Sequence, residues 1–456
     1  MLKDHSASSS NPPVRSSKRL LKWLGAAVFG SSLLVAGCGG GSDPSQSWVG
    51  TWSAAPTGPA DATVTAALAA PFTFTNQTVR MIVRSSVDGS QVRVRLSNEI
   101  GNAPSSVLVN AAQVALRSSG SSIVAGSSRA LTFNGQTSVT IPPKGFVLSD
   151  PVKLDVPALA DLAISLHLPG PISVNSFHAI TRQTNYVSAA GNFVDAATMP
   201  TAATSPYWYL LSGVDVVHDD RVAALVAFGD SITDGFGEQK DRVDAPTPWP
   251  SWPSRLAERL QANDSTKSLA VLNAGIAGNR ILNDAALSAP LSLASLQGYA
   301  TAGPSALSRF QRDVVGQANA SCVVVLLGIN DIGQGPARGQ VVTADQIIAG
   351  HQQIIAKARS AGLSVIGATL TPFAGFPAPY YSADNEAKRQ AVNAWIRGSK
   401  SFDAVIDFDA VVKDPAVPTQ LLASFDSGDH LHPSDAGYQA MANSIDLPTV
   451  RGLCFK

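Results

Sequence analysis

The chain changes character at residues 221–233, which read RVAALVAFGDSIT. The apolar run at 223–228 is short and unbroken, as expected for a strand that is buried on both faces of a sheet. Four more such runs follow, at residues 270–272, 322–327, 363–370 and 404–408. Because helical segments follow the first four of the five runs, the pattern predicts an α/β domain with a parallel sheet covered by helices.

One of these helices has a clear start signal in the sequence. Thr343-Ala344-Asp345-Gln346 is a capping box, in which the threonine and the glutamine satisfy two free backbone N–H groups. Apolar residues then recur on one helical face, and Gly362 ends the pattern. In α/β sheets, loops that leave the carboxyl ends of the strands carry the chemistry, so residues after the predicted strands are the first candidates for a functional site.

The first half of the chain has a period of two. Within residues 48–219, apolar and polar residues alternate, for example at 79–84 and 92–97 on either side of Asp88-Gly89. Alternation around an Asp-Gly pair predicts a β-hairpin, and Asn134-Gly135 between two alternating runs predicts a second one. No helical stripe interrupts these strands, which predicts an all-β sandwich with a jelly-roll-like architecture.

Length and charge set limits on the organisation and the partners. A chain of 456 residues is too long for one compact core, so we expect a β-sandwich domain at residues 48–219 and an α/β domain at 220–456. Lys and Arg together number 33, as do Asp and Glu, which leaves no net charge at pH 7. A neutral chain has no field that would attract nucleic acid or an anionic membrane.

The beginning of the chain predicts export. A basic leader precedes an apolar stretch at residues 23–35 that is too short to span a bilayer, as in a signal peptide. Val-Ala-Gly-Cys at 35–38 resembles the lipobox of bacterial lipoproteins, which implies a lipid on Cys38 and, without Asp at the next position, an outer-membrane location. Residues 1–38 are thus expected to be a lipoprotein signal peptide and 39–47 a flexible linker. The alternative is an ordinary cleaved signal peptide and a secreted protein.

Two further cysteines, Cys322 and Cys454, lie outside this leader. An oxidising compartment allows them to pair, but Cys322 opens an apolar run and is also compatible with a buried free thiol. The sequence contains no cysteine and histidine spacing typical of a metal site, so we expect neither a metal nor another cofactor.

Ser231 comes directly after the apolar run at 223–228, within Gly-Asp-Ser-Ile. A serine at such a junction is held rigidly, although the same motif also occurs as a capped turn. A serine nucleophile needs a base, and the base needs an acid that fixes its tautomer. Asp429 and His432 are three residues apart and can face the same side. His430 is the competing base, but its position next to Asp429 directs its side chain elsewhere.

Two loops after other predicted strands contain possible hydrogen-bond donors. Gly278 lies in the glycine-containing loop 273–279 and could offer its backbone N–H group. Asn330 lies in Gly328-Ile329-Asn330-Asp331 and could offer its side-chain NH₂ group. Acyl transfer needs two or three donors where the oxyanion forms, but tight βα connections alone also explain such loops.

Taken together, these four blocks resemble the SGNH (GDSL) hydrolase family over about Arg221 to Leu447. Ser231 matches the family's nucleophile, and Asp429 and His432 match the rest of its triad. The N–H group of Ser231, Gly278 and Asn330 match its oxyanion hole. The first block has Ile where the family usually has Leu, which is a conservative change. The resemblance implies a three-layer α/β/α domain and serine ester hydrolysis without a cofactor.

The order of the two halves resembles a secreted bacterial branch of that family called XynE-like, which is linked by name to polysaccharide deacetylation. We therefore expect a carboxylic ester hydrolase that acts on polysaccharide or small-molecule esters and contacts the membrane only through a lipid at Cys38. A lipase, arylesterase or thioesterase for small acyl chains is the alternative enzyme. A carbohydrate-binding surface lipoprotein without activity is the alternative of another class, and the complete set of matching residues argues against it. The oligomeric state is left open.

Residues that shape the substrate site are harder to place. Residues 281–304 are long for a βα connection and could cover the site as a lid. Phe236, Trp249 and Trp252 follow the nucleophile loop and either line an apolar wall or pack in the core.

Overall fold

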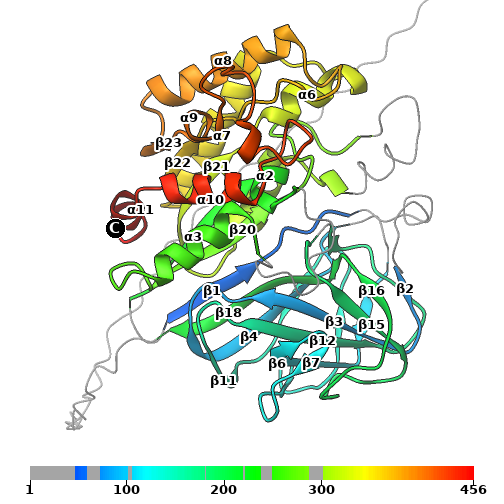
Figure 1. The fold of residues 1–456 in the computed structure, drawn as a ribbon. Helices are drawn as coiled ribbons and strands as arrows, with labels where there is room; N and C mark the ends of the chain where they lie inside the picture. The colour runs from blue at the N-terminus through cyan, green and yellow to red at the C-terminus, as the bar shows by residue number, and fades with distance from the viewer. Residues whose placement is uncertain are drawn as a thin grey trace, which may run out of the picture. The chain divides into compact units, whose positions relative to one another are not determined.

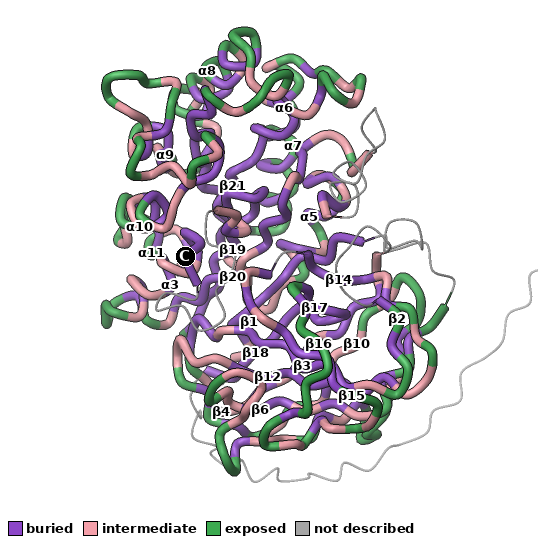
Figure 2. Tube along the Cα trace, turned by 45° about the vertical axis from the view of Figure 1, so that its right-hand side comes forward, coloured by how far each residue is buried: buried purple, intermediate pink, exposed green. Residues whose placement is uncertain are grey.

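A parallel sheet forms the centre of the second half of the chain in the computed structural model, which describes residues 47–58, 72–100, 105–179, 181–218, 221–237, 249–286 and 301–456 (Figure 1). Its strands are β19 (Ala223–Gly229), β20 (Leu269–Gly275), β21 (Ala320–Leu326), β22 (Ser364–Ala368) and β23 (Ala404–Ile406). They lie in the order β20-β19-β21-β22-β23, and every neighbouring pair is parallel. All seven residues of β19 and the last five of β21 are buried, and Figure 2 shows these two strands in the buried interior. The predicted parallel sheet is confirmed.

Helices follow the strands of this sheet. They are α2 (Ser231–Asp234), α3 (Trp252–Gln261), α5 (Ala306–Phe310), the π-helix η1 (Gln311–Val315), α6 (Ile329–Arg338), α7 (Ala344–Ser360), α8 (Ala383–Gly398), α9 (Phe408–Val412), the 3₁₀-helix η2 (Ala423–Phe425), α10 (Asp435–Ser444) and α11 (Leu447–Cys454). The predicted capping box is formed at Thr343, where α7 begins. The fifth predicted strand is wrong at its end, because Asp407 accepts a hydrogen bond from the Ala410 N–H group and starts α9 at Phe408. The three-layer arrangement stays a prediction.

The first half of the chain contains two antiparallel sheets. One consists of β1 (Ser47–Ser53), β18 (Leu211–His218), β4 (Gly89–Ser97), β10 (Phe146–Leu148) and β11 (Val152–Val156). The other consists of β16 (Thr201–Ser205), β15 (Asn185–Ala190), β3 (Gln77–Arg84), β12 (Asp161–Leu168), β6 (Ala111–Ser119), β7 (Ser122–Ile123) and β8 (Arg129–Leu131). Short pairs are β2 (Thr73–Phe74) with β13 (Ile172–Ser173), β14 (Phe177–His178) with β17 (Trp208–Tyr209), and β5 (Val107–Val109) with β9 (Val139–Ile141). The region is β-rich, and its jelly-roll-like packing stays a prediction.

The hairpin predicted at Asp88-Gly89 is wrong, and the one predicted at Asn134-Gly135 forms only between Phe133 and Gln136. Strand β3 pairs with β12 and β15, whereas β4 pairs with β18, β10 and β11, so Asp88-Gly89 connects two different sheets. The reason lies in β1, where the Thr51 hydroxyl accepts hydrogen bonds from the N–H groups of Ser86 and Val87 and draws the connection inward. Asn134-Gly135 does form a two-residue turn with φ values of 51° and 77°, but the strands beside it, β8 and β9, pair with β6 and β5.

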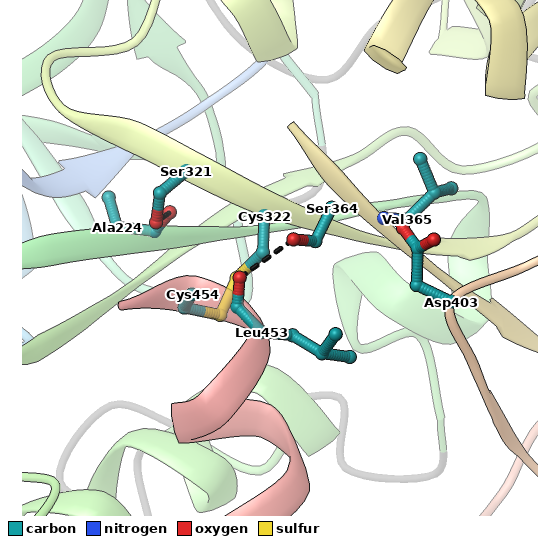
Figure 3. Close-up of a disulfide and its surroundings, with 8 residues drawn as sticks. All are labelled: Ala224, Ser321, Cys322, Ser364, Val365, Asp403, Leu453 and Cys454. Atoms are coloured by element: carbon teal, nitrogen blue, oxygen red, sulfur yellow. Dashed lines mark hydrogen bonds between the residues drawn. A yellow bond between two sulfur atoms is a disulfide. The ribbon is translucent and has the colours of Figure 1, made fainter. Parts of the chain in front are cut away.

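A disulfide joins Cys322 on β21 to Cys454 at the end of α11 (Figure 3). The two Cα atoms are 5.1 Å apart, which is within the normal range for a disulfide. Beside it, the Ser364 hydroxyl donates a hydrogen bond to the carbonyl oxygen of Leu453. Of the two possibilities that the sequence left open, the structure therefore has the paired form, which fastens the last helix to the parallel sheet.

The β-rich half and the parallel sheet lie within one compact unit, Pro44–Lys456. Ser86 Oγ accepts a hydrogen bond from the Val271 N–H group, and Ser53 Oγ donates one to the carbonyl oxygen of Asn273, both at 3.1 Å. These bonds join the β-rich half to β20 at the edge of the parallel sheet. Because of these contacts, the first half can influence the positions of residues that follow the parallel strands.

Several predictions concern residues outside the described ranges. They are the signal peptide, Cys38, the linker up to residue 46, the domain boundary at 219–220 and residues 287–300 of the predicted lid. Ser47, predicted as the end of the linker, already lies in β1. Within the described ranges, none of the helices has both the length and the apolar character needed to cross a bilayer.

Candidate active site

The ends of three neighbouring strands bring the predicted site residues to one edge of the sheet. Gly229, the last residue of β19, lies opposite Gly275 on β20 and Leu326 on β21. Ser231, Gly278 and Asn330 follow these three strand ends within four residues or fewer. The strand order reverses at β19, and in sheets of this type ligands bind at the carboxyl edge beside such a reversal.

Ser231 is the first residue of α2, a single helical turn that follows β19 directly. The carboxylate of Asp230 caps this turn by accepting a hydrogen bond from the Ile232 N–H group at 3.0 Å. A side chain on Gly229 would put its Cβ only 2.0 Å from Thr233 Oγ1, so glycine is required for the turn to fold back against its strand. The local sequence thus holds the Ser231 hydroxyl in a fixed place.

His432 lies beside Ser231, with its Nε2 atom 2.9 Å from Ser231 Oγ. Its Nδ1 atom lies 2.6 Å from Asp429 Oδ2. The other oxygen of Asp429 accepts hydrogen bonds from the N–H groups of Leu431 and His432, at 2.9 and 2.8 Å. Partial burial alone would raise the pKa of Asp429, but the hydrogen bonds and the charge of His432 hold that pKa well below its usual value. Asp429 is therefore ionised and orients the imidazole.

His430, the competing base in the sequence, is paired with a different carboxylate. Its Nδ1 atom lies 2.7 Å from Asp426 Oδ2, and about half of its side chain is exposed. Its ring packs against Gly375, where an added Cβ would lie 2.9 Å from the ring. The geometry therefore supports His432 as the base.

Asn330 has its side-chain carbonyl occupied and its NH₂ group free. Oδ1 accepts hydrogen bonds from Gln334 Nε2 at 2.8 Å and from the Tyr380 hydroxyl at 3.0 Å, which fixes the orientation of the amide. Nδ2 is buried and has no hydrogen-bond partner among the described residues. A buried donor without a partner is rare in folded proteins and is common where a ligand or an intermediate supplies the acceptor.

Gly278 is linked to Asn330 through one side chain. Gln334 Nε2 donates to the carbonyl oxygen of Gly278 at 2.9 Å as well as to Asn330. Gly278 has a φ of 77°, and a Cβ on it would lie 3.2 Å from the Cβ of Ala302. The positive φ and the nearby Ala302 show why this position requires glycine, and Gln334 joins the Gly278 loop to Asn330 at the start of α6.

Buried carboxyl groups also surround the site. Burial raises the pKa of Asp230 to about 7, and the charge of Asp331 adds to the rise. Burial likewise raises the pKa of Asp331 to about 6, although its oxygens accept hydrogen bonds from the N–H groups of Ile281 and Leu282. Asp331 therefore anchors the first residues of the predicted lid. Within the described part of the chain, no group of three or more His, Cys, Asp or Glu side chains is arranged to hold a metal ion.

Arg309 is a supporting residue that the sequence does not identify as part of the site. Its buried guanidinium donates hydrogen bonds to the carbonyl oxygens of Gly229 and Ala274 and to Asn279 Oδ1, at 2.8, 2.8 and 3.0 Å. Burial lowers the pKa of Arg309 to about 10, although the ion pair with Asp313 opposes the change. Arg309 thus stays charged at neutral pH and ties the end of β19 to the loop that carries Gly278.

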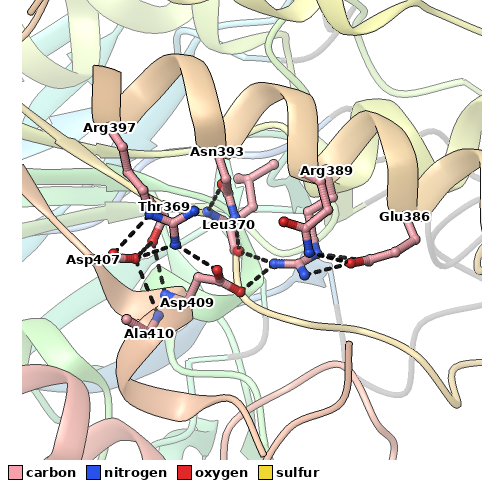
Figure 4. Close-up of polar contacts among 10 residues, drawn as sticks. Thr369, Leu370, Glu386, Arg389, Asn393, Arg397, Asp407, Asp409 and Ala410 are labelled. Atoms are coloured by element: carbon pink, nitrogen blue, oxygen red, sulfur yellow. Dashed lines mark hydrogen bonds and ion pairs between the residues drawn. The ribbon is translucent and has the colours of Figure 1, made fainter. Parts of the chain in front are cut away.

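A network of charged side chains fixes the chain where it leaves β22 (Figure 4). Arg389 and Asn393 of α8 both donate to the carbonyl oxygen of Leu370, at 2.9 and 2.8 Å. Asn393 Oδ1 also accepts from the Leu370 N–H group, and Arg389 is paired with Glu386. The segment held in this way leads to Tyr380, the donor that orients Asn330.

The three aromatic residues after the nucleophile loop have different places. The Phe236 ring lies against His432, with 4.5 Å between ring centroids. Trp252 is completely buried, and its Nε1–H group bonds to the Thr233 hydroxyl, so it belongs to the core. Trp249 donates to Asp161 of the β-rich half. Of the three, Phe236 is the one that these contacts place next to the candidate triad.

A hydroxyl, an imidazole and a carboxylate in line at the carboxyl edge of a parallel sheet are the arrangement of hydrolases that use a catalytic triad. The family model of the GDSL-like lipases and acylhydrolases matches residues 227–440, and this part of the chain is a GDSL-like hydrolase domain. The resemblance to the SGNH (GDSL) family is thereby confirmed.

Solved structures that are similar to this chain include a lipase and two esterases. A GDSL-like lipase from Bacteroides thetaiotaomicron is 19% identical, with 50% of this chain and 89% of that chain covered and a TM-score of 0.35. The native aryl esterase of M. smegmatis is 18% identical, with 51% and 100% covered and a TM-score of 0.37. Est24, a carbohydrate acetylesterase from Sinorhizobium meliloti, is 15% identical, with 49% and 95% covered and a TM-score of 0.35. No curated protein matches the chain.

Proposed function

We propose that the protein is a serine carboxylic ester hydrolase in which Ser231 is the nucleophile and His432 the general base. The observation that carries the proposal is the distance of 2.9 Å between Ser231 Oγ and His432 Nε2, in a histidine whose other nitrogen is held by Asp429. A hydroxyl needs such a base, and the base needs such a carboxylate, to attack a carbonyl carbon at neutral pH.

The proposed reaction has two steps. His432 takes the proton of Ser231 as the hydroxyl attacks the ester carbonyl, and then gives that proton to the leaving alcohol. Water, deprotonated by His432, attacks the acyl group and breaks its bond to Ser231 Oγ, which takes the proton back from His432. In both steps the oxyanion accepts hydrogen bonds from the free Nδ2 of Asn330 and from the backbone N–H groups of Ser231 and Gly278.

Short acyl esters, and acetyl groups on polysaccharide in particular, are the proposed substrates. The support is the resemblance of a β-rich half followed by a GDSL-like domain to the XynE-like branch. We also propose that the protein is exported and anchored by a lipid on Cys38, which the basic leader and the Val-Ala-Gly-Cys motif support. Loss of membrane association in Cys38→Ala would test the anchor.

The activity is tested with a series of p-nitrophenyl esters from acetate to palmitate and with acetylated xylan. We expect the highest kcat/KM for acetate, release of acetate from the xylan, and no turnover by Ser231→Ala, which should fold normally. A maximum at long chains would favour the lipase alternative. No turnover of any ester, or of a thioester, by the wild-type protein would contradict the proposal.

A further inference from the structure

A histidine of the β-rich half contacts the helical turn that carries Ser231. His178, at the end of β14, is buried, with Nδ1 2.7 Å from the carbonyl oxygen of Ala55 and Nε2 3.1 Å from Asp234 Oδ1. Carbonyl and carboxylate oxygens only accept, so both ring nitrogens carry protons. Burial would lower the pKa of His178, but the charge and hydrogen bond of Asp234 outweigh burial and the nearby Arg309, and the pKa is raised. His178 is therefore a buried imidazolium that is paired with Asp234.

Asp234 is the last residue of α2, only three residues after Ser231. A helix of one turn is not stable by itself and depends on contacts with the rest of the fold. Two contacts come from the parallel-sheet half: Trp252 Nε1 donates to the Thr233 hydroxyl, and Asn273 Nδ2 donates to the Thr233 carbonyl oxygen. His178 adds a charged contact from the β-rich half, so both halves of the chain set the position of this turn.

Arg182, four residues after His178, is linked to His432 of the candidate triad through Phe236. The guanidinium carbon of Arg182 lies 4.2 Å from the centroid of the Phe236 ring, and that ring lies 4.5 Å from the ring of His432. The Phe236 N–H group also donates to the carbonyl oxygen of Ser231 at 2.9 Å. Arg182 has a φ of 56°, a conformation that a residue with a side chain adopts only where its surroundings hold it there.

These contacts border a small pocket that the reacting side chains do not line. A cavity of about 70 Å³ is lined by His178, Arg182 and Asp234 among others, but neither Ser231 nor His432 lines it. A volume of this size holds a few water molecules rather than a substrate. His178 and Arg182 therefore do not contact the reacting atoms directly; they contact Asp234 and Phe236, which in turn support the site.

From these contacts we propose that the β-rich half is a positioning element of the active site. His178 holds the Ser231 turn through Asp234, and Arg182 holds the imidazole of His432 through Phe236. The inference rests on the proposed function, because its effect is the alignment of the Ser231 hydroxyl with its base. Both residues are positioning residues, since they touch side chains that support the reacting groups.

The test compares His178→Gln and Arg182→Ala with matched controls in the same half of the chain. His167→Gln changes another buried histidine, whose Nε2 lies 3.0 Å from Asn76 Oδ1. Arg93→Ala removes another arginine from an aromatic ring, that of Trp48, at 4.4 Å. Because a small misplacement of a base costs about 10- to 100-fold in rate, we expect kcat for p-nitrophenyl acetate to fall by about that factor in both test variants. KM should stay nearly constant, and Arg182→Lys should recover part of the loss.

A double-mutant cycle guards against a loss that reflects unfolding alone. Asp234→Asn keeps the shape of the side chain and removes its charge, so it should lower kcat like His178→Gln, and the double variant should lose little more. Additive losses, or equal kcat losses in the two controls, would overturn the inference. So would wild-type kcat in both test variants while the wild-type protein hydrolyses esters. If the wild-type protein hydrolyses no ester, the proposed function itself is wrong. That result is distinct from a failure of the positioning inference, in which the wild-type protein is active.

Discussion

Replacement of Asn330 by alanine is the most informative single change among the proposed oxyanion donors. The variant removes the free Nδ2 donor and leaves the Tyr380 hydroxyl without its acceptor, whereas the Gln334 amide loses one acceptor and keeps the carbonyl oxygen of Gly278. Loss of one oxyanion donor costs about 10²- to 10³-fold in kcat, or about 2.7–4 kcal/mol of transition-state stabilisation. The orphaned Tyr380 hydroxyl costs about 1–3 kcal/mol of folding stability where water does not reach it.

The two effects are separated by steady-state kinetics with p-nitrophenyl acetate and by thermal unfolding of the same samples. Asn98→Ala is the matched control, because Asn98 is a buried asparagine of the β-rich half that donates to the carbonyl oxygens of Ser105 and Pro142. It should lower Tm without lowering kcat. If Asn330→Ala kept wild-type kcat, or raised only KM, the role of its amide in the transition state would be refuted.

Three further predictions concern the fold around the site. Gly278→Ala should lose about 1 kcal/mol or more of stability, since φ is 77° there, and should also lower kcat; an unchanged Tm and kcat would contradict this. Reduction of the Cys322–Cys454 disulfide, or Cys454→Ser, should lower the free energy of unfolding by about 2–5 kcal/mol, because the bond closes a loop of 132 residues. Asp230 has a folded-state pKa of about 7, above its ordinary 3.8, so its contribution to stability is present at low pH and is lost as pH rises towards 7. The Tm of Asp230→Asn relative to the wild type should therefore be higher at pH 8 than at pH 5. A difference in Tm that does not change with pH would contradict the raised pKa of Asp230.

Part of the fold follows from local pattern. The five apolar runs of the second half became strands because each is continuous and bounded by turn residues, and a parallel sheet buries both faces of its strands. The alternating runs of the first half also became strands, but their partners were predicted wrongly at Asp88-Gly89. Pairing there depends on hydrogen bonds to the hydroxyl of Thr51, more than thirty residues away, which no local motif records.

In the candidate site, too, some residues can be predicted from local sequence and others cannot. Ser231, Gly278, Asn330 and His432 stand in motifs whose residue types the proposed chemistry requires, so the sequence makes them candidates. Tyr380 and His178 could not be found in this way, because a lone tyrosine or histidine acquires a role only when the fold brings it to Asn330 or Asp234. Their sequence neighbourhoods carry no motif.

A fluorophosphonate reacts covalently with a serine only where a base activates it, so mass spectrometry of the treated protein reports directly on the proposed pair. We expect a single adduct on the peptide that contains Ser231, no adduct in Ser231→Ala, and much slower labelling in His432→Ala than in His430→Ala. An adduct on a different residue, no adduct on the wild-type protein, or wild-type labelling rates in His432→Ala would contradict the assignment.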